Sequence, residues 1–121
     1  MKLTVEMPWG KDLNKNHSRL PESARRNYKR HVKGWMNRLG WEVKAKMMAL
    51  GVAALEPEVA VKVDFRYPDA QKRDDHNYYE VLCDALKGVV GMDDDQIRVS
   101  TGTIEIDRDN PGFTITVSDG Q

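Results

Sequence analysis

The sequence predicts an α+β domain with a mainly antiparallel sheet of about four strands and two helices, in the order β-α-β-α-β-β. Segments 2–7 and 59–66 alternate apolar and polar residues, which is typical of strands with one buried face. Apolar residues recur at spacings of three and four over 22–50 and 78–89, which is typical of helices packed on one side. We expect the 121 residues to form a single domain.

The first strand and the loop after it differ sharply in composition. The strand places Leu3, Val5 and Met7 on one face, and Pro8 ends it. Segment 9–21 is polar and lacks apolar periodicity. Long loops of this kind often carry function, so this segment is a candidate binding loop.

The first predicted helix has one apolar face and one basic face. Pro21 and Glu22 fit a helix start, and Gly51 closes the pattern. The basic face carries Arg25, Arg26, Lys29, Arg30, Lys33, Arg38, Lys44 and Lys46. This face is either a solvated helix surface or a surface that contacts phosphates. The second interpretation gains support because acidic partners for i,i+4 ion pairs are scarce.

The last two predicted strands follow the second helix. Apolar residues occupy odd positions at 97–99 and even positions at 104–106, with Gly102 at the change of phase. A β-bulge at Gly102 would restore one buried face. The turn signal Asp-Asn-Pro-Gly at 109–112 then predicts that the final strand, 113–117, forms a hairpin with the strand before it.

Charge is unevenly distributed along the chain, although the formal net charge is zero. Residues 1–66 carry 14 Lys and Arg against 7 Asp and Glu, whereas residues 67–121 carry 5 against 12. A basic half suited to phosphates and an acidic half suited to cations is consistent with a nuclease, but two such halves can also neutralise each other. The apolar runs fall short of the roughly 20 residues that span a bilayer, and the N-terminus does not read as a secretory signal. We therefore expect a cytoplasmic protein without a membrane partner.

Two clusters of oxygen ligands flank the second predicted helix, at 74–77 (Asp-Asp-His-Asn) and 93–95 (Asp-Asp-Asp). Such clusters suit a divalent-metal nuclease, because carboxylates gather a hydrated Mg²⁺ against a phosphate. The alternative is local structure, since Asn77 as N-cap with Glu80 three residues later fits a capping box. Three adjacent carboxylates repel one another, however, and a cation would relieve that repulsion.

Three motifs around these clusters carry a family resemblance. The sequence reads Arg-Asp-Asp-His-Asn at 73–77, Asp-Ala-Leu at 84–86 and Asp-Asp-Asp-Gln-Ile at 93–97. These motifs resemble the signature of the RusA family of Holliday junction resolvases: Arg-Asp-x-Asp-Asn, then Asp-Ala-Leu, then Gly-aromatic-x-Asp-Asp-x-Gln-Val/Ile. The opening Met-Pro-Trp at 7–9, with Asn14 and Asn16, is also similar to the family's Pro-Trp-Pro-Pro-x-Asn. The resemblance extends over about the whole chain, with its specific motifs in 72–97.

The resemblance implies a RusA-like fold and a homodimeric, Mg²⁺-dependent endonuclease that cuts four-way DNA junctions in recombination and repair. The family's first and third catalytic aspartates fall on Asp74 and Asp94. The second falls on His76, and histidine ligates Mn²⁺ more readily than Mg²⁺. The family's functional lysine falls on Glu80, which reverses the charge. Asp75 is a candidate to replace the missing carboxylate.

The resemblance and the residues together give three groups of candidates. The catalytic candidates are Asp74, His76 and Asp94, and the candidate metal ligands add Asp75, Asp93 and Asp95. The candidate DNA contacts are Lys11, Asn14, Lys15, Asn16, Arg19, Arg25, Arg26, Lys29, Arg30, Lys33, Lys72 and Arg73.

The length of the second helix bears on how the two clusters meet. A helix over 77–90 would be about 21 Å long. Asp74 and Asp94 of one chain would then meet only if the helix were shorter or the connection folded back; otherwise a dimer partner completes the site. Two other functions stay open. One is a junction-binding homodimer that has lost cleavage, suggested by His76 and Glu80. The other is a small dimeric interaction protein whose aspartates are caps and turns.

Overall fold

The computed structural model describes residues 1–10, 13–14 and 21–119, without the side chains of Arg25, Asp94 and four other helical residues. The elements are β1 (Lys2–Pro8), α1 (Glu22–Ala49), β2 (Val59–Tyr67), the short 3₁₀ helix η2 (Asp75–Tyr78), α2 (Tyr79–Val90), a second 3₁₀ turn η3 (Asp94–Gln96), β3 (Ile97–Ile106) and β4 (Gly112–Asp119). The predicted α+β class and the order β-α-β-α-β-β are confirmed.

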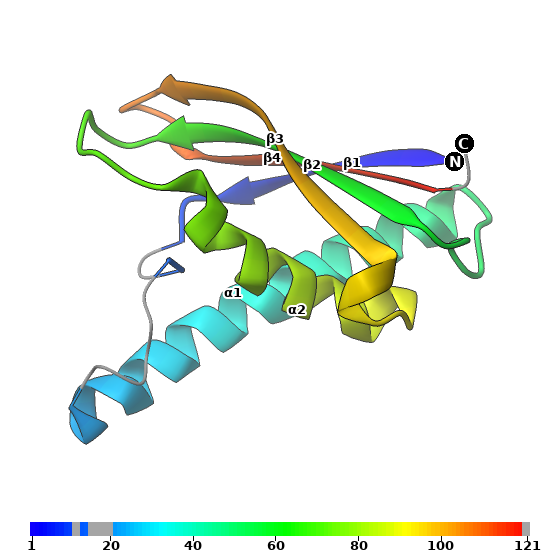
Figure 1. Cartoon of the computed structure of the whole chain (residues 1–121), viewed down its shortest axis with the longest axis horizontal. Coiled ribbons are helices and arrows are strands. Elements are labelled where there is room, and N and C mark those ends of the chain that lie inside the picture. The colour runs from blue at the N-terminus through cyan, green and yellow to red at the C-terminus, as the bar shows by residue number, and fades with distance from the viewer. Residues whose placement is uncertain (11–12, 15–20, 120–121) are drawn as a thin grey trace.

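The four strands form one mixed sheet in the order β1-β4-β2-β3, and both helices cover the same face of it (Figure 1). β4 pairs antiparallel with β1 and with β2, whereas β2 and β3 are parallel. Parallel neighbours need a crossover connection, and α2 provides it. The predicted hairpin of the last two strands is therefore wrong. β2 lies between β3 and β4, because a turn signal fixes a change of direction but not the neighbour with which a strand pairs.

The predicted bulge at Gly102 is confirmed. Val63 pairs with Thr101 and Phe65 with Ile104, so two residues of β3 lie opposite Asp64. A side chain at Gly102 would place its Cβ 2.1 Å from the Asp64 carboxylate, which explains the glycine. The bulge also returns the apolar residues of β3 to one face, because Ile104 and Ile106 pair with Phe65 and Tyr67 on the buried side of β2. These two isoleucines are nevertheless 51% and 52% exposed, because β3 lies at the edge of the sheet.

The apolar face of α1 packs on the sheet as the sequence predicted. Val32, Trp35, Leu39, Val43 and Met47 are buried at intervals of three and four residues. They lie against buried side chains of β1, β2 and β4. Burial of this apolar surface stabilises the packing of α1 on the sheet. Within the described residues, no helix is both long and apolar enough to cross a membrane.

An aromatic cluster closes the core near the end of β2. Trp9 stacks on Phe113 with ring centroids 5.0 Å apart, and it meets the edges of Tyr67 and Tyr78. The Trp35 indole N–H donates to the carbonyl of Pro8 at 2.9 Å. These contacts fix the start of the polar loop and the end of η2 against the same core.

Candidate active site

The two acidic clusters lie at opposite ends of α2. Asp74 and Asp75 precede it, and Asp93 to Asp95 follow it. The helix has 12 residues, which corresponds to a length of about 18 Å. In Figure 1 the helix separates the segment that leaves β2 from the turn that enters β3. One chain therefore holds the clusters apart rather than together.

Asp74 caps the first end. Its carboxylate accepts a hydrogen bond from the backbone N–H of His76 at 3.0 Å and so satisfies one of the free amides of η2. The predicted capping box of Asn77 and Glu80 is wrong. Asn77 lies inside η2, and α2 begins at Tyr79 without a side-chain cap in the described residues. The 3₁₀ turn moves the cap three residues upstream, and one oxygen of Asp74 is left for another ligand.

Asp75 is held against strand β3 by a chain of hydroxyl groups. The Thr101 hydroxyl donates to the Asp75 carboxylate. The Tyr79 hydroxyl lies 2.5 Å from the same Thr101 oxygen. A threonine hydroxyl has one proton, and here that proton goes to the carboxylate, so Tyr79 is the donor to Thr101. The half-buried Asp75 carboxylate thus has a defined position, whereas most surface carboxylates do not.

The ring of His76 stacks on Tyr79, with centroids 4.7 Å apart and an interplanar angle of 20°. Tyr79 therefore supports the two residues that follow Asp74. It is linked to Asp75 through Thr101, and its ring stacks on His76. This arrangement orders the three residues that the sequence nominated as ligands. The candidate metal ligands at this end are two carboxylates and an imidazole. Carboxylates suit Mg²⁺, and an imidazole suits Mn²⁺.

Arg73 is packed into the aromatic cluster beside this end. Its guanidinium lies 5.3 Å from the ring centroid of Trp9 and 5.2 Å from that of Tyr67, and it is 2.8 Å from the Asp69 carboxylate. The hydrogen bond from Arg73 holds the pKa of Asp69 below its usual value. Arg73 was a candidate DNA contact, and its packing indicates that it also supports the loop before Asp74.

The hydroxyl of Tyr67 is a buried polar group whose pKa depends on that burial and on the charges of Asp75 and Asp74. The residue is 6% exposed, and its hydroxyl has no hydrogen-bond partner in the described part of the chain. Burial, followed by the negative charge of Asp75, raises the pKa of Tyr67. The hydroxyl is therefore held in its protonated form within the core.

The second end has a different character. Gly91 ends α2 in the left-handed conformation, with φ of 69°, and its N–H donates to the carbonyl of Lys87 at 2.9 Å. Gln96 closes the next turn, because its N–H donates to the Asp93 carbonyl and its side chain accepts from the Asp93 N–H. The carboxylates of Asp93 and Asp95 are exposed and take no part in these bonds, while the Asp94 side chain lies outside the description.

The described residues of one chain do not form a complete metal site. Nowhere in 1–10, 13–14 and 21–119 do three or more histidine, cysteine, aspartate or glutamate side chains gather around one point. Asp74 and Asp75 offer oxygen ligands of the kind that Mg²⁺ takes, but they are too few. The remaining ligands would have to come from elsewhere.

The candidate DNA contacts fall into two groups. Lys11, Lys15, Asn16 and Arg19 lie outside the described residues, as does the side chain of Arg25, and Asn14 sits half-buried in a turn. Arg26, Lys29, Arg30 and Lys33 are exposed on the first half of α1, and Lys72 is exposed before Asp74. In Figure 1 this half of α1 and η2 lie toward the same end of the molecule.

The comparison with known families agrees with these features. The family model described as Endodeoxyribonuclease RusA matches residues 10–118, which include both acidic clusters and α2. The chain belongs to the RusA family. A search of curated proteins found no match. RusA-family membership implies endonuclease action on Holliday junctions.

Two departures from the RusA-family signature have a structural setting here. His76 stacks on Tyr79, and the carboxylate next to it, Asp75, is the one that Thr101 holds. Glu80 is exposed in the first turn of α2, where negative charge favours the helix. Tyr79 and Thr101 were not among the site residues predicted from the sequence. Tyr79 stands four residues after Asp75, which is a usable signal, but Thr101 reaches Asp75 only through the parallel pairing of β2 with β3.

Proposed function

We propose that this RusA-family protein is a divalent-metal-dependent endodeoxyribonuclease that resolves four-way DNA junctions as a homodimer, in recombination and repair. In each site, Asp74 and Asp75 come from one subunit and Asp94 from the other. The observation that carries the proposal is the position of the two acidic clusters at opposite ends of α2, with one carboxylate already held in place.

The length of α2 supports the proposed homodimer. A spacing of about 18 Å is too large for one ion to touch carboxylates at both ends, because ligand bonds to such ions are about 2 Å long. A two-fold axis gives each first cluster a second cluster from the partner. A dimer then has two equivalent sites, which suits a substrate in which two strands must be cut.

The residues of the chain divide the chemistry among them. A bound Mg²⁺ or Mn²⁺ would activate a water molecule and stabilise charge on the phosphate. Thr101 and Tyr79 fix the direction of the Asp75 carboxylate. The neighbouring residue, Asp74, would offer the carboxylate oxygen that does not accept from the His76 N–H. The exposed basic side chains of α1 would hold the DNA backbone, which fixes register without reading sequence.

A mixing experiment tests the shared site. The Asp75→Asn and Asp94→Asn variants should each be inactive on a synthetic four-way junction. After the two are mixed and subunits exchange, half of the sites in a mixed dimer have both wild-type clusters, so nicking should return. The product should be mainly single nicks, because each mixed dimer holds one intact site. If mixed dimers form but stay inactive, the two clusters act within one subunit and the shared site is wrong.

The metal preference tests the role of His76. If the imidazole is a ligand, Mn²⁺ should support cleavage better than Mg²⁺, and His76→Asp should shift the preference toward Mg²⁺. His76→Phe keeps a ring to stack on Tyr79 and serves as the control for packing. Equal metal preference in all three proteins would place His76 outside the metal site.

The DNA contacts of α1 are tested by salt dependence. Neutralising Arg26, Lys29 and Lys33 together should lower the slope of log affinity against log salt by up to about 5, since a homodimer loses six phosphate contacts and each contributes roughly 0.9. Neutralising Lys2 and Lys62, which are exposed on the sheet, is the control. An unchanged slope in the α1 variant would contradict the assignment.

A second function is favoured by His76 and Glu80, which replace an aspartate and a lysine of the family signature. In that case the protein is a homodimer that binds junctions without cutting them. Retarded junction DNA with no nicks, in either Mg²⁺ or Mn²⁺, would support this alternative over the nuclease.

A further inference from the structure

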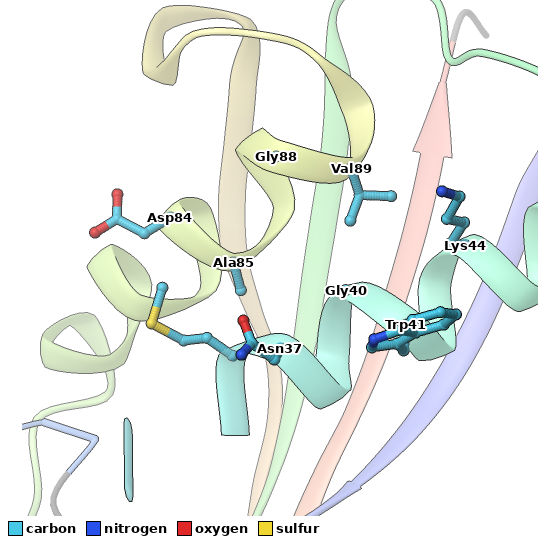
Figure 2. A pocket seen from close by; sticks show the side chains of 9 residues that line it. Asn37, Gly40, Trp41, Lys44, Asp84, Ala85, Gly88 and Val89 are labelled. Atoms are coloured by element: carbon cyan, nitrogen blue, oxygen red, sulfur yellow. The ribbon is translucent and has the colours of Figure 1, made fainter. Parts of the chain in front are cut away.

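Large apolar side chains are exposed in two regions of the described part of the chain. Three lie on the second half of α1 or just after it, and Figure 2 shows one of them, Trp41, beside the groove between α1 and α2. The other two, Ile104 and Ile106, are half-exposed on β3. The β3 pair differs from the α1 residues because it belongs to the strand that holds the Asp75 carboxylate.

Ile104 and Ile106 lie on the face of the sheet that the helices cover. They pair with Phe65 and Tyr67, whose side chains are buried in the core. Residues that lie opposite each other on neighbouring strands point to the same face of a sheet. Thr101 is on this face too, because its partner on β2 is also buried. The two exposed isoleucines and the threonine that donates to Asp75 therefore share one face.

The isoleucines are also close to the acids along the strand. From the partner of Thr101 to the partners of Ile104 and Ile106, β2 advances by two and by four residues. The isoleucines therefore lie about 7 Å and about 13 Å from Thr101 along the sheet. Burial, followed by the charge of Asp75, raises the pKa of Tyr67, the residue paired with Ile106. Both observations place the apolar pair at the border of the candidate metal site.

The chemistry of the pair points to the face of a nucleic-acid base. Isoleucine offers neither a charge nor a hydrogen bond, so Ile104 and Ile106 cannot hold a phosphate. Proteins that bend DNA commonly pack isoleucine, leucine or phenylalanine against unstacked base steps. Nucleotides follow one another at about 3.4 Å along a strand, so a phosphate at Asp75 would bring bases two to four steps away over the pair.

The pair is too small to hold a protein partner by itself. Two half-exposed isoleucines leave roughly 100 Å² of apolar surface. A stable protein interface buries about 800 Å² on each partner. A small apolar surface beside a phosphate site fits a base contact better than a protein interface.

We propose that Ile104 and Ile106 contact the faces of unstacked bases at the centre of a four-way junction, and that this contact makes the protein prefer branched DNA to linear duplex. The inference rests on the proposed function in one respect, which is that the DNA is held with a phosphate at Asp74 and Asp75. In a linear duplex every base is stacked on both sides, and a base face must be exposed by unstacking. Where strands exchange, the stack is interrupted and a base face is exposed at lower cost.

Competition binding of a four-way junction against a linear duplex, with Ca²⁺ in place of Mg²⁺, tests the preference without relying on cleavage. Ile104→Thr with Ile106→Thr keeps β-branched side chains in the strand but removes apolar surface. The double variant should bind the junction about tenfold or more weakly and bind the duplex as the wild type does. Equal losses on both DNAs, or no loss on either, would overturn the proposal.

Two control variants show whether the effect belongs to this pair. Ile104→Val with Ile106→Val keeps most of the apolar surface and should keep most of the junction preference. Met48→Thr with Leu50→Thr removes two exposed apolar side chains near the end of α1 and should change neither affinity. If the α1 variant loses the preference to the same extent as the β3 variant, the contact is not made by the isoleucines.

Unstacking is measured directly with 2-aminopurine, a base analogue whose fluorescence rises when it leaves the stack. At the junction centre its emission should rise when the wild-type protein binds, whereas in the middle of an arm it should not. At saturating protein, Ile104→Thr with Ile106→Thr should give a much smaller rise. A full rise with this variant would show that other groups unstack the bases, and the proposal would be wrong.

Sedimentation equilibrium of the free protein tests the competing occupant. The double threonine variant should keep the association state of the wild type, because the isoleucines are proposed to meet DNA and not protein. A change in association state, with no change in junction preference, would assign the pair to a protein interface and reject the proposal.

The outcomes separate this inference from the proposed function. A protein that prefers junctions through the two isoleucines, but makes no nicks in Mg²⁺ or Mn²⁺, keeps the inference and rejects the nuclease. A protein that still prefers and nicks junctions after both isoleucines are replaced keeps the nuclease and rejects the inference.

Discussion

The two ends of α2 carry similar charge but differ in how that charge is used. At the first end, Asp74 caps the 3₁₀ turn and Asp75 is held by Thr101 and Tyr79. At the second end, backbone groups and Gln96 close the turn without the carboxylates of Asp93 and Asp95. The first end therefore has fixed positions for its acids, whereas the second presents acids to solvent.

The comparison shows that α2 has two roles. It is the crossover connection between β2 and β3, and it keeps the two acidic clusters apart. The crossover from β2 to β3 needs α2 on the sheet, and its buried residues Leu82 and Leu86 hold it there. The same packing keeps the clusters apart by the length of the helix. Under the proposed function, a site that uses both clusters would be assembled between two molecules.

The largest expected effect is on the rate of junction cleavage, and it distinguishes Asp75 from the exposed Asp93 and Asp95. Asp75→Asn should lower the rate of junction cleavage by about 100-fold or more, because a divalent-metal site contributes several kcal/mol to the transition state. Asp93→Asn and Asp95→Asn should each cost less than about tenfold. Single-turnover cleavage of a labelled junction measures all three. Equal losses in the three variants would remove the distinction between the two ends.

A smaller effect is expected from the support of Asp75. Thr101→Val removes the hydroxyl that donates to the carboxylate, and loss of such a supporting bond should weaken metal binding by about 10- to 100-fold. Thr101→Ser keeps the hydroxyl and should bind nearly as the wild type does. Electron paramagnetic resonance of Mn²⁺ titrations measures the affinity without cleavage. Unchanged affinity in Thr101→Val would show that the hydroxyl chain has a purely structural role.

The cap is expected to contribute about 1 kcal/mol to stability. Asp74→Ala should lower the free energy of unfolding by that amount, because the His76 N–H loses its partner. Asp74→Asn should keep the cap, since asparagine is an equally good N-cap, while removing the charge. Urea unfolding compares the two variants. If Asp74→Asn is as unstable as Asp74→Ala, charge rather than capping stabilises this end.

The last expected effect concerns the alkaline side of the stability profile. Burial raises the pKa of Tyr78 to about 12, from an ordinary value of 10.0. The folded state therefore holds this proton more tightly than the unfolded state, so the contribution to stability is complete below pH 10 and is lost as the pH rises to about 12. Tyr78→Phe should lose less stability over this interval in urea unfolding. An identical loss in the variant would assign the alkaline transition to another group.

The sequence predicts some parts of the fold and of the candidate site better than others. The strands, the two helices and the bulge at Gly102 follow from local periodicity, and local periodicity is what a sequence records most directly. The Asn77 cap was predicted wrongly because the chain offers several acceptors near one helix start, and the geometry of the 3₁₀ turn selected Asp74. The hairpin was predicted wrongly because strand neighbours depend on the whole sheet.

The element order, the apolar faces, the crowding of acids and the resemblance to the RusA family could all be read from the sequence. Three features became visible only in the folded chain: β3 pairs with β2, Thr101 reaches Asp75, and Trp41 stays exposed. The physical reason is the range of the interactions. Periodicity and capping act within a few residues, whereas pairing, burial and the distance between the two acidic clusters depend on where an entire crossover helix packs.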